Sequence, residues 1–111
     1  MPPDPHASLR AAIVGRTARV GVIGLGYVGL PLAMAIAKGG FAVTGFDIDP
    51  GKIVSLDAGR SYIAAVTDAA LGVQTAAGRF GSTTDFTRLG LCDVIVICVP
   101  TPLTRHREPD L

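Results

Sequence analysis

Several residue types are scarce in this chain of 111 residues: it has no tryptophan and two cysteines, and charged residues make up 17% of it. Ten lysines and arginines against nine aspartates and glutamates give a formal net charge of +1. Because a nucleic-acid binder needs clustered basic side chains to neutralise phosphates, this scattered and balanced charge excludes nucleic acid as the expected partner. The hydrophobic content of 49% is that of one packed domain rather than a disordered tail.

Cysteine and histidine are too sparse to indicate a metal centre or a disulfide framework. Cys92 and Cys98 are expected to be reduced and structural, since Cys98 lies in the apolar run VIVICV, where a small thiol fills space in a core. Neither His6 nor His106 has a second ligand at metal-binding spacing. We therefore expect no metal site.

A run of about 18 residues without charge, from Val20 to Ala37, has the outline of a membrane span or an export signal. Four glycines and Pro31 interrupt it, and in a helix interior a glycine costs about 1 kcal/mol and a proline about 3 kcal/mol relative to alanine. The cost disappears if residues 19–24 form a strand and a helix begins near Val28, with Pro31 in its first turn. We therefore expect neither membrane insertion nor export.

Strands and helices are expected to alternate along the chain, which predicts an α/β fold with a Rossmann-type doubly wound parallel sheet. Further strands are expected within 41–47, 79–85 and 93–100, and helices within 49–59 and 68–78. Asp49, Asp68 and Asp85 are the expected N-caps of the two helices and of a brief helical turn before the last strand.

The last strand, DVIVICVP, is a continuous β-branched run that is typical of a parallel strand buried on both faces. In a sheet of order 3-2-1-4-5-6 the chain would be truncated after about four strands, with this strand at an open edge. We expect residues 1–18 to form a flexible arm and residues 19–111 an incomplete Rossmann domain.

Gly24, Gly26 and Gly29 form a G-x-G-x-x-G pattern, here called the glycine loop (residues 24–29), between the first expected strand and helix. That context is the one a dinucleotide-binding loop requires. The first glycine permits a tight turn, the second lets the backbone approach a pyrophosphate, and the third allows close packing of helix and strand. A glycine-rich turn that only packs is the alternative.

Three side chains are candidates for further cofactor contacts. Asp47 ends the second expected strand about 20 residues after the glycines, where a carboxylate can bind the ribose hydroxyls of NAD and repel the 2′-phosphate of NADP. Lys52 could face the ribose edge or the pyrophosphate, or simply be solvated. Thr101, between Pro100 and Pro102 beyond the fourth strand, is placed for a contact near the nicotinamide, unless those prolines only stiffen the strand exit.

The segments GLGYVGLPLA, FDIDPGKI and CVPTPLTRHREPDL together resemble the N-terminal NAD-binding domain of the UDP-glucose/GDP-mannose dehydrogenase family, from Arg19 to Leu111. The resemblance implies that NAD is the cofactor. It places the cofactor contacts on the glycine loop with the backbone of Tyr27 and Val28, and on Asp47, Lys52 and Thr101. Many relatives have arginine in place of Lys52.

The resemblance also implies a reaction for the complete enzyme. The C6 hydroxyl of a UDP-sugar is oxidised to the uronic acid with two NAD, and the tail PLTRHREPDL is most similar to the branch that uses UDP-N-acetylglucosamine or a close relative. The family's catalytic cysteine, lysine and asparagine lie downstream, so we expect no catalytic residue here and no turnover by this chain alone. The resemblance further implies a cytoplasmic role in polysaccharide biosynthesis, and a homo-oligomer only with the missing C-terminal part.

Two other readings stay open at this point. One is a stand-alone dinucleotide-binding module without catalysis, which should be stable in isolation. The other is a different Rossmann dehydrogenase, of the hydroxyacid or 6-phosphogluconate type, for which the tail would have no role.

Overall fold

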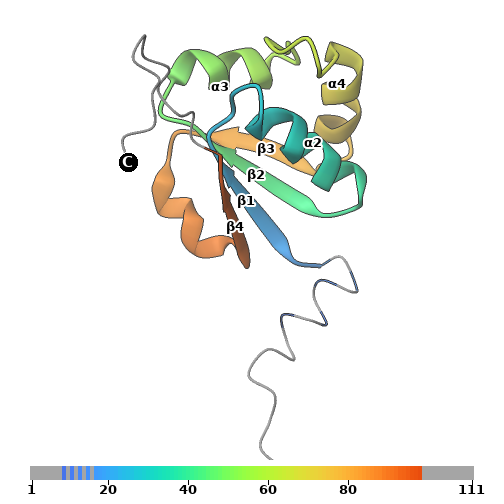
Figure 1. Ribbon diagram of the computed structural model, residues 1–111, viewed down its shortest axis with the longest axis vertical. Helices are drawn as coiled ribbons and strands as arrows, with labels where there is room; N and C mark the ends of the chain where they lie inside the picture. The colour runs from blue at the N-terminus through green and yellow to red at the C-terminus, as the bar shows by residue number, and fades with distance from the viewer. Residues whose placement is uncertain (1–8, 10, 12, 14, 16, 99–111) are drawn as a thin grey trace, which may run out of the picture.

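The computed structural model describes residues 17–98 together with residues 9, 11, 13 and 15 (Figure 1). Most of the expected arm, and the whole PTP segment with Thr101, lie outside the described residues. The described elements are, in chain order, β1 (Arg19–Ile23), α2 (Gly29–Lys38), β2 (Ala42–Phe46), α3 (Pro50–Asp57), α4 (Asp68–Ala76), β3 (Phe80–Thr83), the 3-10 helix η1 (Phe86–Leu91) and β4 (Val94–Ile97).

The four strands form one parallel sheet in the order β3-β2-β1-β4. Val22 of β1 is the centre of this arrangement, since it pairs with Gly45 on β2 and with Val96 on β4. The order is that of the first four strands of a doubly wound sheet, so the predicted fold is confirmed. The carboxyl ends of β1 and β2 therefore lie side by side, with the glycine loop leaving one and Asp47 following the other.

Helices α2, α3 and α4 gather on one side of the sheet (Figure 1). The main core lies beneath them, built from alternate strand residues and the inward faces of the helices. Its members include Val20, Val22, Val43 and Phe80 from the strands and Leu30, Ala33, Leu56 and Leu71 from the helices. Alternate residues of a strand face opposite sides of a sheet, so the remaining strand residues point to the other face.

The opposite face is only partly covered, and here one expectation is wrong. Phe46 is fully buried against Phe86 of η1, with ring centroids 5.7 Å apart. On β4, however, Ile95 and Ile97 are 46% and 66% exposed, so this strand is not buried on both faces as predicted. The β-branched run correctly predicted a parallel strand. On this face, however, Phe86 of η1 covers Phe46 of β2, whereas the described residues leave Ile95 and Ile97 of β4 largely exposed.

Local signals place most helix ends as expected. The first helix begins at Gly29 after Val28 and holds Pro31 in its first turn, where the missing N–H leaves no hydrogen bond unmade. Asp49 caps α3 by accepting a hydrogen bond from the Gly51 N–H at 2.9 Å, with Pro50 as the first helical residue. None of the helices in the described part of the chain is long and apolar enough to cross a membrane.

The cap of α4 differs from the prediction by one residue. Thr67, not Asp68, is the N-cap, and its hydroxyl oxygen accepts from the Ala70 N–H at 3.0 Å. Asp68 instead accepts a hydrogen bond from the Ser61 N–H at 2.8 Å, which ties the first turn of α4 to the preceding connection. Threonine and aspartate both cap helices, and here Thr67 is the cap because the Asp68 carboxylate is bonded to the Ser61 N–H.

Candidate functional site

The two outer glycines of the glycine loop touch each other. Gly24 has a φ of 93°, a left-handed conformation that favours glycine, and its N–H donates to the Phe46 carbonyl at 2.8 Å. A Cβ placed on Gly29 would lie 1.6 Å from the Gly24 carbonyl oxygen. This backbone-to-backbone contact lets α2 start directly above the end of β1.

The middle of the glycine loop is open. A Cβ placed on Gly26 would have nothing within 4 Å, and the side chains of Tyr27 and Val28 are exposed. Among the described residues, no acceptor binds the backbone N–H of Gly26, Tyr27 or Val28. Three N–H donors thus stand at the N-terminus of α2, where the helix dipole also favours an anion.

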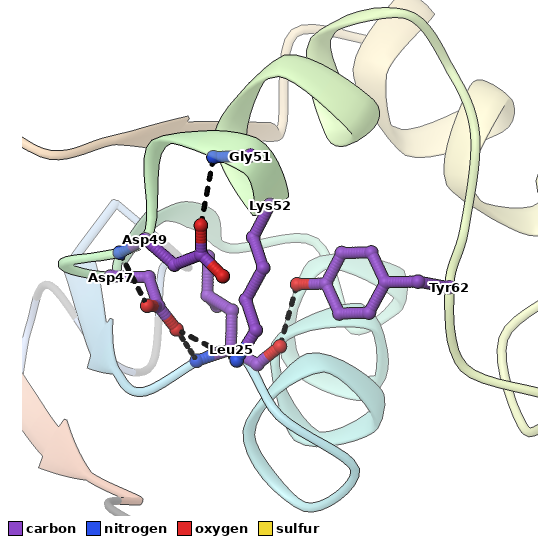
Figure 2. Close-up of polar contacts among 6 residues, drawn as sticks. All are labelled: Leu25, Asp47, Asp49, Gly51, Lys52 and Tyr62. Atoms are coloured by element: carbon purple, nitrogen blue, oxygen red, sulfur yellow. Dashed lines mark hydrogen bonds and ion pairs between the residues drawn. The ribbon is translucent and has the colours of Figure 1, made fainter.

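Leu25, between these two parts, is held at three points (Figure 2). Its N–H donates to Asp47 Oδ2 at 2.9 Å, and its carbonyl accepts from the Tyr62 hydroxyl at 2.6 Å. Its side chain is fully buried against Gly45, where a Cβ would lie 2.7 Å from each Leu25 δ-carbon. The glycine loop is therefore fixed by Leu25, its buried large apolar residue.

Asp47 is a buried carboxylate whose ionised form is stabilised by its neighbours. It is 7% exposed, and besides Leu25 it accepts from the Asp49 N–H at 2.9 Å and lies 3.5 Å from Lys52 Nζ. Burial raises the pKa of Asp47, but the two N–H donors and the Lys52 ammonium outweigh it, so the pKa is lowered from its usual 3.8. The side chain is ionised at neutral pH.

A pocket of about 520 Å³ opens at the carboxyl ends of β1 and β2. Its walls are mainly apolar, and its polar groups come from the β2–α3 connection and the first turn of α3. The lining residues are Ile23, Gly24, Phe46, Asp47, Ile48, Asp49, Lys52 and Phe86. Apolar walls with a few placed polar groups are typical of a small-molecule site, and this edge of a doubly wound sheet is where ligands bind.

The structure brings most of the predicted site residues together. Gly24, Asp47 and Lys52 line the pocket, and Leu25 links Asp47 to the rest of the glycine loop. Thr101 lies outside the described residues. Sequence reasoning missed Tyr62, Ile48 and Phe86; the alternation of Asp47, Ile48 and Asp49 could have placed the exposed Ile48 beside the carboxylate, but no local pattern points to Tyr62.

The two cysteines pack rather than face the pocket. Cys92 Sγ would be 2.9 Å from a Cβ on Gly21, and Cys98 Cβ would be 3.3 Å from one on Gly29. Both are free thiols, and burial together with the charge of Asp93 raises the pKa of the Cys92 thiol. A raised pKa disfavours the nucleophilic thiolate, which agrees with a packing role for Cys92.

Backbone donors, a buried carboxylate and an apolar pocket lie at adjoining points of one sheet edge, which is where doubly wound folds bind dinucleotides. Fold and site together define a Rossmann-type domain that binds NAD. More particularly, the chain belongs to the UDP-glucose/GDP-mannose dehydrogenase family, since the model of that family's NAD binding domain matches residues 18–111.

Individual relatives agree with this assignment. The chain is 41% identical over 97 residues to a UDP-N-acetyl-D-glucosamine 6-dehydrogenase of Pseudomonas aeruginosa, covering 84% of this chain and 21% of the relative. It is 36% identical over 94 residues to a UDP-N-acetyl-D-mannosamine dehydrogenase of Pyrococcus horikoshii, covering 84% and 22%. The chain thus spans about a fifth of the length of these curated relatives.

Solved structures show the same likeness. A GDP-mannose dehydrogenase from Pseudomonas aeruginosa superposes with a TM-score of 0.73 at 35% identity, over 81% of this chain and 21% of that one. An NDP-N-acetyl-D-galactosaminuronic acid dehydrogenase from Methanosarcina mazei gives a TM-score of 0.75 at 28% identity, over 90% and 23%. Family membership sets aside the hydroxyacid and 6-phosphogluconate alternative.

Proposed function

We propose that this chain binds NAD for a nucleotide-sugar dehydrogenase that oxidises the C6 hydroxyl of a UDP-sugar to the uronic acid. The observation that carries the proposal is that three N–H groups of the glycine loop, for which the described residues offer no acceptor, lie beside the pocket that holds the ionised Asp47. For the sugar, we propose UDP-N-acetylglucosamine or a close relative. The 41% identity to an enzyme named for that substrate supports this choice.

Each part of NAD has a partner in this proposal. The N–H groups of Gly26, Tyr27 and Val28 hold the pyrophosphate, helped by the N-terminus of α2. The open space at Gly26 supports this assignment, because a pyrophosphate must approach the backbone there. The carboxylate of Asp47 accepts hydrogen bonds from the adenosine ribose, and Ile48 and Phe86 offer apolar contact to the adenine ring.

Asp47 also provides a reason to select NAD over NADP. A 2′-phosphate would bring negative charge against a buried carboxylate whose position is fixed by two backbone donors. Lys52 could offset the repulsion, but it already pairs with the same carboxylate at 3.5 Å. We therefore assign Lys52 to the ribose edge, where it keeps Asp47 charged and in place.

NAD supplies the hydride acceptor, and two NAD are reduced for each uronic acid formed. We assign the described residues the binding and orientation of the cofactor and no part in the chemistry at the sugar carbon. Thr101 is proposed to contact the nicotinamide side of the cofactor. Binding without turnover is the behaviour expected of this chain, and the cytoplasm is the proposed location.

Calorimetric titration of the purified protein with NAD and with NADP tests the proposal. NAD should bind with 1:1 stoichiometry, and NADP should bind at least about tenfold more weakly, or about 1.4 kcal/mol, the scale of one repulsive contact between like charges at a few ångströms. A cooperative thermal transition by circular dichroism checks that the sample is folded. A folded protein that binds neither dinucleotide, or prefers NADP, would contradict the proposal.

A further inference from the structure

We propose that Tyr62 is a positioning residue for NAD: its hydroxyl orients the peptide group between Leu25 and Gly26 so that the Gly26 N–H faces the pyrophosphate. The inference rests on the proposed function and adds to it a residue from a distant part of the chain. Tyr62 lies in the connection between α3 and α4, 37 residues after Leu25. Figure 2 shows its ring pointing toward the glycine loop.

The argument begins with the geometry of one peptide group. In a trans peptide the C=O of one residue and the N–H of the next point in opposite directions. The Leu25 carbonyl accepts the Tyr62 hydroxyl at 2.6 Å, and no peptide bond in the described residues is cis. Holding the Leu25 oxygen toward Tyr62 therefore turns the Gly26 N–H away from Tyr62, to the open side of the glycine loop.

Without that hydrogen bond, the peptide group itself would have no partner among the described residues, although the groups on either side are held: the Leu25 N–H by Asp47, and the Gly26 carbonyl by the Leu30 N–H at 3.0 Å. Gly26 has no side chain, its surroundings are open, and among the described residues nothing accepts its N–H. Tyr62 is also the one donor to the Leu25 carbonyl in the described part of the chain. Glycine reaches backbone conformations that other residues avoid, so an unheld peptide here can rotate and lose its orientation.

The preceding peptide group is held in a matching way. Asp47 accepts the Leu25 N–H at 2.9 Å and thereby fixes the peptide between Gly24 and Leu25. Two side chains from different connections thus hold two consecutive peptide groups, one through its N–H and the other through its C=O. Asp47, which is expected to bind the ribose, thus also shapes the glycine loop. Tyr62 completes that support through the Leu25 carbonyl and not through the Asp47 carboxylate.

The surroundings of Tyr62 keep it in place as a donor. Lys52 Nζ lies 5.9 Å from the centroid of its ring, within range of a cation–π contact, and pairs with Asp47 on its other side. Burial, followed by the negative charges of Asp47 and Asp49, raises the pKa of Tyr62 to about 12. The phenol therefore keeps its proton across the physiological pH range.

The test is Tyr62→Phe, which removes the hydroxyl and keeps the ring. The matched control is Thr75→Val on α4, which also removes one hydroxyl bonded to a backbone carbonyl, here Leu71 at 2.9 Å. Binding of ADP and of adenosine is measured by NMR titration for each protein. ADP carries the pyrophosphate and adenosine does not, so the ratio of their affinities reports how strongly the glycine loop binds phosphate.

In Tyr62→Phe we expect this ratio to fall about fivefold, the usual effect of one lost hydrogen bond, with adenosine affinity and melting temperature little changed. The Gly26 amide resonance of the free protein should also shift. In Thr75→Val the ratio and the Gly26 resonance should match the wild type. These results together would support the positioning role.

Other outcomes overturn it. An unchanged ratio in a folded Tyr62→Phe, or an equal loss for ADP and adenosine, would show that the hydroxyl does not orient the phosphate-binding peptide. Loss of the cooperative thermal transition would make Tyr62 a structural residue instead. A wild-type protein that binds ADP no better than adenosine would overturn the proposed function itself, and the role of Tyr62 with it.

Discussion

The three glycines of one motif meet different surroundings, which separates a part of the glycine loop that serves folding (the folding part) from a part that we propose to bind the cofactor (the binding part). Gly29 faces the Gly24 carbonyl at a distance that no Cβ could occupy, whereas Gly26 faces open space. The outer pair thus joins β1 to α2, and the middle residue leaves room for a ligand. The motif therefore meets two structural requirements: close backbone contact at its outer glycines and open space at its middle glycine.

The contrast extends to backbone hydrogen bonds. The Gly24 N–H and the Leu25 N–H are both taken, by the Phe46 carbonyl and by Asp47. The next three N–H groups, from Gly26 to Val28, find no acceptor in the described part of the chain. The boundary between the folding and the binding part therefore lies at Leu25, the residue that Asp47 and Tyr62 both hold.

The largest effect is expected from Gly29→Ala, which breaks the folding part. The new methyl would overlap the Gly24 carbonyl oxygen at 1.6 Å, and backbone on both sides must move. We expect a loss of at least about 3 kcal/mol in the free energy of unfolding, measured by urea denaturation. Gly72→Ala, inside α4 with nothing within 4 Å, is the control and should be neutral or up to about 1 kcal/mol more stable. Equal stability of the two variants would refute the close contact.

A smaller and more selective effect is expected from Gly26→Ala, which challenges the binding part. The methyl meets no protein atom within 4 Å, so the melting temperature should stay close to that of the wild type. It enters the space assigned to the pyrophosphate, so NAD affinity should fall about tenfold or more, about 1.4 kcal/mol, by calorimetry. Gly72→Ala again serves as control and should bind NAD normally. An unstable Gly26→Ala, or one with full affinity, would mean that the two parts are not separable as described.

The smallest effect concerns the carboxylate that joins the two parts. Because the pKa of Asp47 is lowered in the folded protein, the unfolded chain takes up its proton first as the pH falls. The stabilisation is complete above the ordinary aspartate pKa of 3.8 and is lost as the pH drops through the lower value of the folded state. Urea denaturation from pH 7 down to pH 3 should show the start of this loss in the wild type.

Asp47→Asn is the comparison for that measurement. It should be less stable at neutral pH and should lack this contribution to the acid dependence. Asp85, whose pKa the Thr87 hydroxyl and N–H lower, still contributes in both proteins. Parallel pH curves for the wild type and Asp47→Asn would show that Asp47 is not the group responsible.

Local signals were enough to predict the architecture and the glycine loop. Glycine spacing, Pro31 near a helix start and the Asp49-Pro50 pair each act within one turn of chain, so their structural meaning is readable from the sequence. Asp47 was predicted to bind ribose because it follows a strand. Its second role, holding the Leu25 N–H, became visible only when β1 and β2 were side by side.

Features that depend on distant neighbours escaped prediction. Tyr62 reaches Leu25 across 37 residues, and nothing in the sequence around it marks such a contact. The exposure of Ile95 and Ile97 depends on which side of the sheet other segments cover, and a run of β-branched residues carries no information about that. The choice between Thr67 and Asp68 as the cap of α4 turned on the Ser61 N–H, which the fold brings to Asp68.

The placement of the tyrosines has a practical consequence. The chain has no tryptophan and two tyrosines, so its intrinsic ultraviolet fluorescence comes from Tyr27 and Tyr62. Tyr27 belongs to the open part of the glycine loop, and Tyr62 donates its hydroxyl to Leu25 in the same loop. The natural emission of the protein therefore originates at the proposed nucleotide site, and events there can be followed optically without attaching a dye.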